Sequence, residues 1–324
     1  MSERRAAGGD GVVTVRTDVP TRGMGARAFR GSVGRRVLIG VAVIYVGSLL
    51  LLPIVTLATG AFAEGIGKFG RALAHPNALH ALFVTGVMVV FAVALNAVFG
   101  TLVAWVLVRD RFPGKKVLSA LVDVPFALSP VIAGFVLIEL FGTKGLLRSA
   151  TDALGVQVAF ALPGMVIATT FVSLPFVIRE VMPVLEEIGT DQEKAAYTLG
   201  ASALATFRRV TLPSIRWGVF HGITLTAARS IGEFGAVLVV SGGVAGRTET
   251  ATSFVYRALE DRNDTGAYGM ALLLSVASIL LLFAMDAVKH RRAGAPGGEA
   301  RGGGQARDLA VSGTGEKVAR EVSP

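Results

Sequence analysis

The sequence predicts an all-α integral membrane protein with six transmembrane helices, and three observations carry that prediction. Hydrophobic residues make up 52% of the 324 positions and charged residues only 17%, whereas an average soluble domain is about 25% charged. The mean hydropathy is +0.61. The charges are also unevenly placed, because long stretches contain no Asp, Glu, Lys or Arg. Such a chain belongs in a bilayer rather than in a pair of soluble domains.

Six segments are long and apolar enough to cross a membrane, since a transmembrane helix needs about 20 mainly apolar residues. Their approximate limits are 37–62, 79–108, 117–140, 160–182, 215–241 and 268–288. The first, second and fourth contain long uncharged runs. The other three include or border charged residues, namely Asp123, Glu139, Arg229, Glu233 and Asp286.

The first segment resembles a secretory signal, because Ala61-Phe62-Ala63 imitates a small-residue cleavage site. A signal peptide has an apolar region of about 7–15 residues behind a short basic segment. Here the apolar region is longer and follows 36 residues of chain. We therefore expect an uncleaved first helix.

The net charge of +9 lies mostly at the two ends of the chain. Residues 1–36 and 291–324 are rich in Gly, Ala and Arg, and we expect them to be disordered tails that flank a membrane domain at 37–290. The basic pI of about 10.3 thus describes the tails and indicates no nucleic-acid partner.

Basic residues also predict the orientation, because cytoplasmic loops are enriched in Lys and Arg. The loop 109–116 holds four bases in eight residues, and the loop 179–214 holds Arg179, Lys194, Arg208 and Arg209. The alternate loops are poorer in bases. We expect both of these loops and both termini to be cytoplasmic.

The cytoplasmic segment 186–214 is long for a connector. Thr190 and Glu193 have the spacing of a capping box, which predicts a helix beginning there. Gly200 suits a left-handed C-terminal cap, and Ser202 is placed to cap a second short helix that runs through Arg209 and ends at Leu212-Pro213. Two small-residue helices with a sharp bend are suited to docking into a partner's cleft. The alternative is an amphipathic linker on the membrane surface.

This segment also resembles a known family. The pattern Lys194-Ala195-Ala196, Gly200 after three more residues, Val210 after nine, and then Leu212-Pro213 is similar to the EAA loop of binding-protein-dependent ABC transporter permeases. Lys194 stands where that family usually has glutamate, with Glu193 directly before it. The resemblance extends from about residue 80 to 290 and is strongest to sulfate/thiosulfate permeases of the CysW type, through segments 109–134, 174–185 and 227–250.

The resemblance implies a type I ABC importer permease architecture in a prokaryotic cytoplasmic membrane. It implies a dimer of ABC ATPase subunits, a sister permease and an extracytoplasmic sulfate/thiosulfate-binding protein as partners. ATP and magnesium would lie on the ATPase, since the chain has no G-x-x-x-x-G-K-[ST] motif and is not itself an enzyme. The loop 190–213 would couple to that ATPase through Glu193, Lys194, Ala195, Ala196, Gly200, Arg208, Arg209, Leu212 and Pro213.

Three other functions compete with this interpretation. A molybdate or tungstate ABC importer permease is the nearest, because its tetrahedral dianion has similar geometry. An ion-coupled secondary anion carrier would need intramembrane carboxylates in paired repeats and no docking loop. A membrane-embedded hydrolase would need a Ser/His/Asp constellation, and none is visible in the sequence. The chain also has no cysteine and no pair of histidines at metal-ligand spacing, so we expect no metal or cofactor in it.

Charges and prolines within the predicted spans are further candidates. Arg229 and Glu233 are four residues apart and therefore able to pair on one helical face, either in a gate region or as a structural pair. Pro125, Ser129 and Pro130 predict a break in the third span, either beside the pathway or as a packing kink. Hydroxyls that could line a pathway occur at Ser129, Thr169, Thr170, Ser173, Thr224 and Thr226, and the sequence gives no facing for them.

Overall fold

The computed structural model describes residues 32–293, and every regular element in that range is a helix. The chain divides into two compact units, Met1–Pro53 and Ile54–Pro324, and each is described by itself. Helix α1 (Ser32–Phe62) begins inside the predicted 1–36 tail. Helix α14 (Asp264–Ala293) likewise ends inside the predicted 291–324 tail, and residues 1–31 and 294–324 lie outside the described residues.

The most apolar stretch of 18 residues within Gly34–Phe62 of α1 has a mean hydropathy of 2.6 and no buried residue in the isolated chain. Its side chains from Val37 to Leu52 are mostly aliphatic and exposed. A helix that is apolar on all sides and buried on none is suited to lipid, because lipid tails solvate such a surface as well as protein does.

Three more helices are long and apolar enough to cross a membrane. The first joins α3 (Pro76–Leu95), the π-helical turn η1 (Asn96–Gly100) and α4 (Thr101–Arg109) without interruption. The others are α8 (Leu162–Ile188) and the apolar part of α14 (Asp264–Ala293).

The third and fifth predicted spans are bent helix pairs. Helices α5 (Lys115–Ala127) and α6 (Pro130–Phe141) are bent by 112°, and α11 (Leu212–Ile231) and α12 (Gly235–Ser241) by 61°. The described residues therefore hold four clear spans, or six if each bent pair is one span. The count of six stays a prediction.

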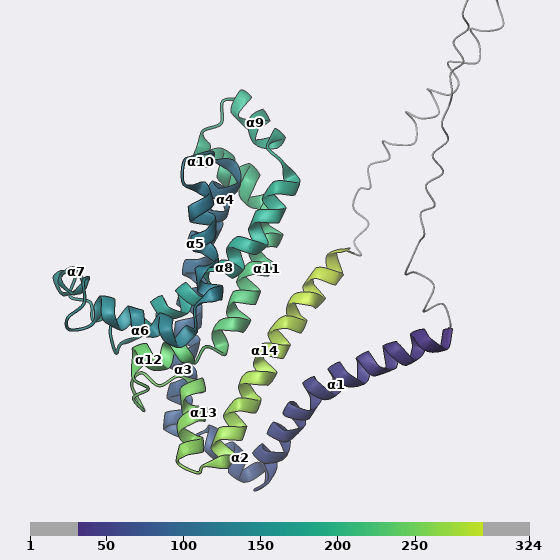
Figure 1. The fold of residues 1–324 in the computed structure, drawn as a ribbon, viewed down its shortest axis with the longest axis vertical. Helices are drawn as coiled ribbons and strands as arrows, with labels where there is room; N and C mark the ends of the chain where they lie inside the picture. Colours follow the sequence, from purple (N-terminus) through teal and green to yellow (C-terminus); the bar gives the residue numbers. More distant parts are fainter. Residues whose placement is uncertain (1–31, 294–324) are drawn as a thin grey trace, which may run out of the picture. The chain divides into compact units, whose positions relative to one another are not determined.

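Helix α8 is the centre of the second unit. It packs against α11, α3, α4, α5 and α12, and more than half of its apolar window is buried. Figure 1 shows α8 and α11 running side by side. Glycines on α11 permit this approach, because a Cβ on Gly222 would lie 2.8 Å from the Cα of Val177.

Short helices complete the unit at the two ends of the α8–α11 pair. Helices α9 (Asp191–Thr198) and α10 (Ala203–Thr206) and the π-helical turn η2 (Phe207–Thr211) connect α8 to α11 at one end (Figure 1). The others are α2 (Ile66–Leu73), α7 (Arg148–Ala153) and α13 (Ala251–Glu260).

Candidate functional site

The loop 190–213 folds as two short helices with a sharp bend, as the sequence predicts. Gly200 has φ +82° and ends α9 in a left-handed conformation. The backbone N–H of Ala201 donates to the carbonyl of Ala196, and that of Gly200 donates to Tyr197. These two bonds form a Schellman cap, which satisfies carbonyls that the end of a helix leaves free.

The capping box predicted at Thr190 and Glu193 is wrong. The Thr190 side chain makes no capping hydrogen bond. The Glu193 carboxylate turns away from the helix start, where its Oε2 lies 2.9 Å from Arg109 Nε and its Oε1 accepts a 2.8 Å hydrogen bond from the Thr211 hydroxyl. A nearby guanidinium attracts a carboxylate more strongly than a neutral backbone N–H does, which explains the difference.

The second helix of the loop begins as predicted and ends differently. Ser202 Oγ accepts a hydrogen bond from the Ala205 N–H at the start of α10. The predicted end at Leu212-Pro213 is wrong, because the helix continues through η2 into α11 up to Ile231. Pro213 lies in the first turn of α11, where a proline is tolerated. The loop is thus joined rigidly to a membrane helix.

Arg109 is a residue of this site that sequence reasoning missed. It is the last residue of α4, and its guanidinium donates to the carbonyls of Leu185 at 3.0 Å and Gly189 at 2.6 Å. With Glu193 it forms an ion pair whose side chains are only 10% and 12% exposed. We call Arg109, Glu193 and Thr211 the clamp, because they join α4, the end of α8, α9 and η2. The sequence shows an arginine at the end of an apolar span, directly before a polar loop. That arginine entered the prediction only as one of the basic residues of the loop 109–116, and not as a residue that pairs with another loop.

The outer surface of the loop combines exposed leucines and small residues with exposed charged side chains. Leu199 and Leu204 are 88% and 67% exposed. Lys194, at the position of the family's usual glutamate, is exposed and lies 3.5 Å from Asp191. A hollow of about 520 Å³ lies beside the bend and is lined by Ala196, Leu199, Gly200, Ala201, Ser202, Ala205, Thr206, Arg209 and Val210. Arg208 and Arg209 are both exposed.

Arg229 and Glu233 lie 2.7 Å apart between Nη1 and Oε2. Glu233 is 2% exposed and lies beyond the end of α11, in the bend before α12. Its other carboxylate oxygen accepts a 3.3 Å hydrogen bond from the Ala236 N–H, and its backbone carbonyl accepts one from the Thr252 hydroxyl on α13. The pair therefore stabilises the 61° bend between α11 and α12. The sequence predicted that both residues share one helical face, whereas Glu233 lies beyond the end of α11.

The break predicted in the third span lies between α5 and α6. Leu128 and Ser129 have extended backbone conformations, and Pro130 is the first residue of α6. A residue before proline avoids the helical region, which explains why α5 ends there. Pro125 lies inside α5 and not at the break.

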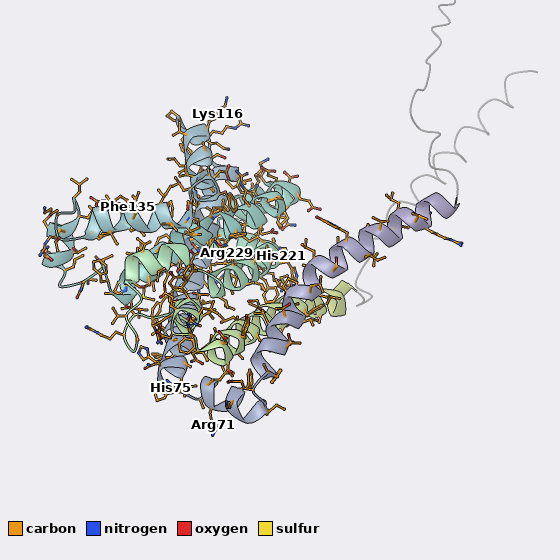
Figure 2. All side chains as sticks on the ribbon, turned by 60° about the horizontal axis from the view of Figure 1, so that its bottom comes forward. Arg71, His75, Lys116, Phe135, His221 and Arg229 are labelled. Carbon is orange, nitrogen blue, oxygen red and sulfur yellow. The ribbon has the colours of Figure 1, made fainter. Side chains whose placement is uncertain are left out.

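Two further side-chain pairs involve α8. Arg179 forms a two-pronged ion pair with Asp123 on α5, with Nε 3.0 Å from Oδ1. His221 on α11 and Glu180 on α8 lie 2.7 Å apart. Figure 2 shows His221 and Arg229 among the packed helices, whereas Lys116 lies at the beginning of α5.

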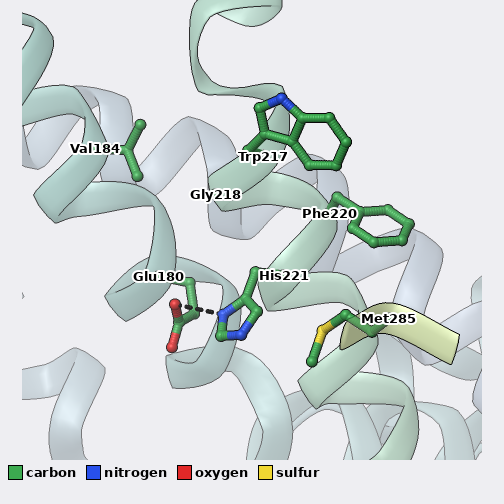
Figure 3. A pocket seen from close by; sticks show the side chains of 7 residues that line it. All are labelled: Glu180, Val184, Trp217, Gly218, Phe220, His221 and Met285. Carbon is green, nitrogen blue, oxygen red and sulfur yellow. Dashed lines mark hydrogen bonds and ion pairs between the residues drawn. The ribbon is translucent and has the colours of Figure 1, made fainter. Parts of the chain in front are cut away.

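The His221–Glu180 pair lies beside a pocket of about 330 Å³. Figure 3 shows the two side chains facing each other from neighbouring helices, with Trp217, Phe220 and Met285 from α14 all on the His221 side of the pair. In the sequence, the signal for this pair is the presence of an acidic residue and a histidine within two apolar spans.

Comparison with known proteins now identifies the family. Residues 96–293 match the family described as "Binding-protein-dependent transport system inner membrane component". The chain belongs to this family. The matched range includes the loop 190–213, the clamp and every charged pair described above.

Curated relatives of this permease family cover most of the chain. It is 46% identical over 245 residues to the sulfate transport system permease protein CysW of Synechococcus elongatus, covering 76% of this chain and 86% of that protein. It is 42% identical to the protein of the same name from Escherichia coli K12, over 80% and 89% of the two chains. The sulfate transport system permease protein CysT of Salmonella typhimurium is 36% identical over 78% and 91%.

Solved structures agree on the fold. A bacterial alginate ABC transporter in complex with a pentasaccharide-bound periplasmic protein matches with a TM-score of 0.66 and 15% identity, over 79% of this chain and 94% of that chain. The MetNI methionine ABC transporter matches with a TM-score of 0.51 and 20% identity, over 65% and 94%. The predicted all-α ABC importer permease fold is confirmed at this level.

Proposed function

We propose that this permease is the membrane subunit of an ATP-driven importer of sulfate or thiosulfate. The observation that carries the proposal is the 42–46% identity to CysW sulfate permeases over at least three quarters of this chain. The permease would provide the translocation path, and ATP hydrolysis would take place on a separate ATPase.

The loop 190–213 is our candidate for coupling to that ATPase. The loop presents exposed leucines, a small-residue hollow and a bend fixed by the Schellman cap. The clamp fixes this loop to α4 and α8. Motion of a docked ATPase would therefore pass directly to membrane helices. A flexible linker would need none of these internal contacts.

A sister permease, an ATPase dimer and an extracytoplasmic binding protein complete the proposed assembly. The similarity to both CysW and CysT relatives supports two different permease chains rather than two copies of one. We place the assembly in the cytoplasmic membrane with both termini cytoplasmic, on the distribution of basic residues.

Oxyanion uptake tests the substrate. Cells that lack this permease and any other sulfate system should lose labelled sulfate or thiosulfate uptake and regain it when the gene is restored. Molybdate uptake, followed in parallel, should be unchanged. Loss of molybdate uptake alone would instead identify a molybdate permease, because a path that avoids tight binding hardly distinguishes the two dianions.

Single cysteines test the orientation in this cysteine-free chain. Ser2→Cys and Thr190→Cys should react with an impermeant thiol reagent only after the cells are opened. Ser149→Cys, on α7, should react in intact cells. Labelling of Thr190→Cys from outside would contradict the orientation.

A further inference from the structure

A hollow of about 410 Å³ lies at the end of the second unit that is opposite the loop 190–213. It is formed by two loops, residues 154–161 before α8 and residues 242–250 between α12 and α13. The loop 190–213 follows the last residue of α8, whereas this hollow includes the first one, Leu162, so the length of a 27-residue helix separates them. In the proposed orientation the hollow is extracytoplasmic. Its lining includes Gln157, Phe160, Val244, Arg247 and Thr248, and no acidic residue of the described chain lines it.

Internal hydrogen bonds fix the loop 242–250. The backbone N–H groups of Arg247, Thr248 and Glu249 all donate to the carbonyl of Val244, at 3.0–3.1 Å. The Thr248 hydroxyl donates a 2.8 Å hydrogen bond to the carbonyl of Ser241 at the end of α12. A loop with these internal bonds keeps one shape, so the side chains that line the hollow are held in place before any ligand arrives.

Arg247 has no partner, whereas the acidic residue beside it is fully paired. Glu249 is 0% exposed, and its two carboxylate oxygens lie 2.6 Å and 3.0 Å from Nε and Nη2 of Arg257 on α13. Arg247 is exposed and makes no ion pair or side-chain hydrogen bond with any residue that the structure describes. The loop therefore neutralises its own acid and leaves a positive charge at the hollow.

The opposite wall of the hollow is fixed to α12 as well. Phe160 has φ +56°, and its N–H donates a 2.8 Å hydrogen bond to the carbonyl of Val240. Its ring lies so close to Gly242 that a Cβ there would be 3.3 Å from Cδ1 of the ring. A bulky residue keeps such a strained backbone only where its surroundings hold it. The Gln157 amide donates one hydrogen bond to the carbonyl of Ala159, which leaves its second hydrogen for a ligand.

These groups suit a small oxyanion. A guanidinium presents its donors in a planar fork that matches two oxygens of a tetrahedral oxyanion. A concave site with charge of one sign and apolar walls, here Phe160 and Val244, concentrates solutes of the opposite charge. An acidic surface of a partner protein would contact an arginine equally well on a flat face. Donors that lie between two loops favour a small ion instead.

We propose that this hollow is a receiving site for the transported oxyanion, which Arg247 binds before it enters the membrane path. The identity of the anion rests on the proposed function. An exposed charge contact is weak, so a single arginine would hold the dianion loosely enough for it to move on, as transport requires. The site would raise the local concentration of oxyanion and would leave selection to the binding protein.

Thiol labelling tests the site without requiring transport. Val244 lines the hollow and is 49% exposed, and Val244→Cys places a single cysteine in this cysteine-free chain. The full importer is labelled with an anionic thiol reagent and with a neutral reagent of the same size, and labelling is read on this subunit. Arg247→Gln should lower the anionic rate relative to the neutral one roughly fivefold, the factor for two unit charges about 4 Å apart in water. Sulfate should slow the anionic reagent more than chloride does at equal ionic strength.

Arg71→Gln is the matched control for that experiment. Arg71 lies on α2 at the same end of the unit, is exposed, and has no ion-pair partner among the described residues, but it does not line the hollow. Arg71→Gln should therefore keep both effects at Val244→Cys. Equal slowing by sulfate and chloride would overturn the proposal, and so would a sulfate effect that persists in Arg247→Gln.

Transport assays separate this site from docking of the binding protein. Arg247→Gln should lower sulfate uptake by a similar factor, while the affinity of the importer for the loaded binding protein and the amount of complex stay parental. Parental uptake would overturn the receiving role. Weaker docking without a specific sulfate effect at Val244→Cys would also overturn it, because Arg247 would then be a contact for the partner protein. A parent importer that takes up none of sulfate, thiosulfate or molybdate would instead overturn the proposed function.

Discussion

Two arginine–carboxylate pairs in this permease have the same chemistry and opposite surroundings. Arg109 and Glu193 are about one-tenth exposed and bind two further carbonyls and a hydroxyl. Arg179 and Asp123 are 44% and 43% exposed and lie on the surface of α8 and α5. The first pair is enclosed by groups of this chain, whereas the second lies open on its surface.

The difference shows what each pair requires from the assembled transporter. A buried pair whose contacts all come from one chain holds the elements of that chain together without outside help. Arg179 was predicted to lie in the cytoplasmic loop 179–214, but α8 continues to Ile188 and includes it. An exposed pair within membrane helices is expensive in lipid, since intramembrane charges almost always face protein or water. We therefore expect the α5–α8 face around Arg179 to be covered in the assembly by another subunit or by the aqueous path.

Breaking the clamp should have the largest effect. Arg109→Gln leaves Glu193 buried without its cation, a change that destabilises proteins by about 3–5 kcal/mol. We expect loss of transport and a lower yield of complex. Arg109→Lys keeps the charge and loses the fork that reaches two carbonyls, so it should assemble but couple poorly, with more ATP hydrolysed per oxyanion transported.

Arg148→Gln is the matched control, because Arg148 forms an exposed pair with Asp152 on α7. It should transport and assemble like the parent. Equal behaviour of Arg109→Gln and Arg148→Gln would show that the clamp is incidental and would remove the contrast between buried and exposed pairs.

The Arg229–Glu233 pair is intermediate, with one buried and one partly exposed partner. Arg229→Ala strands the buried Glu233 and should weaken the α11–α12 bend by up to about 3–5 kcal/mol. Exchanging the two charges in one double variant should restore part of that loss. Co-purification with the ATPase measures the amount of assembled complex. Assembly at the parental level in both Arg229→Ala and Glu233→Ala would contradict this expectation.

Gly200→Val should disturb the bend of the loop without unfolding the spans. A side chain at φ +82° is strained by about 1–2 kcal/mol, more for a β-branched residue. Gly155→Val is the control, since Gly155 also has a positive φ and open surroundings but lies outside the loop. We expect transport to fall more in Gly200→Val than in Gly155→Val at equal membrane insertion. Equal transport in the two would favour the linker interpretation.

These predictions also show where sequence reasoning was sufficient. Gly200 and Ser202 act through bonds to residues a few positions away, so local spacing alone predicted their roles. Arg229 and Glu233 are also near neighbours, and the sequence correctly paired them.

The remaining features depend on contacts between distant parts of the chain. Glu193 prefers Arg109, 84 positions earlier, to its own helix start, and no local pattern contains that alternative. The Asn96–Ser173 bond likewise exists only after the helices pack. The bend near Gly232 was hidden because composition measures the length of an apolar segment and not its direction, and Pro130 predicted the break at Ser129 but not its angle of 112°.

The exposed Arg179–Asp123 pair gives a smaller expected effect, which should differ between the isolated permease and the assembled importer. Arg179→Gln should change the stability of the isolated permease by less than about 1 kcal/mol, because exposed pairs contribute little. In the assembled importer the same variant should lower complex yield or transport, since Asp123 then faces a partner or the path without its cation. An unchanged complex would show that this face is open to water.

The smallest expected effect is at Glu64, beside α2 and outside the spanning helices. The Thr265 hydroxyl donates a 2.5 Å hydrogen bond to its carboxylate, and with the nearby Lys68 ammonium this lowers the pKa of Glu64. A lowered folded-state pKa gives stability that is present above the unfolded pKa of about 4.3 and is lost as the pH falls through the folded value. Thr265→Val should therefore reduce melting temperature slightly at pH 7 and have no effect near pH 3. Lys68→Gln, which removes the contribution of the ammonium group, should also lower the melting temperature at pH 7 and leave it unchanged near pH 3. If both variants lowered the melting temperature equally at both pH values, the ionised carboxylate would have no part in joining α14 to the start of α2.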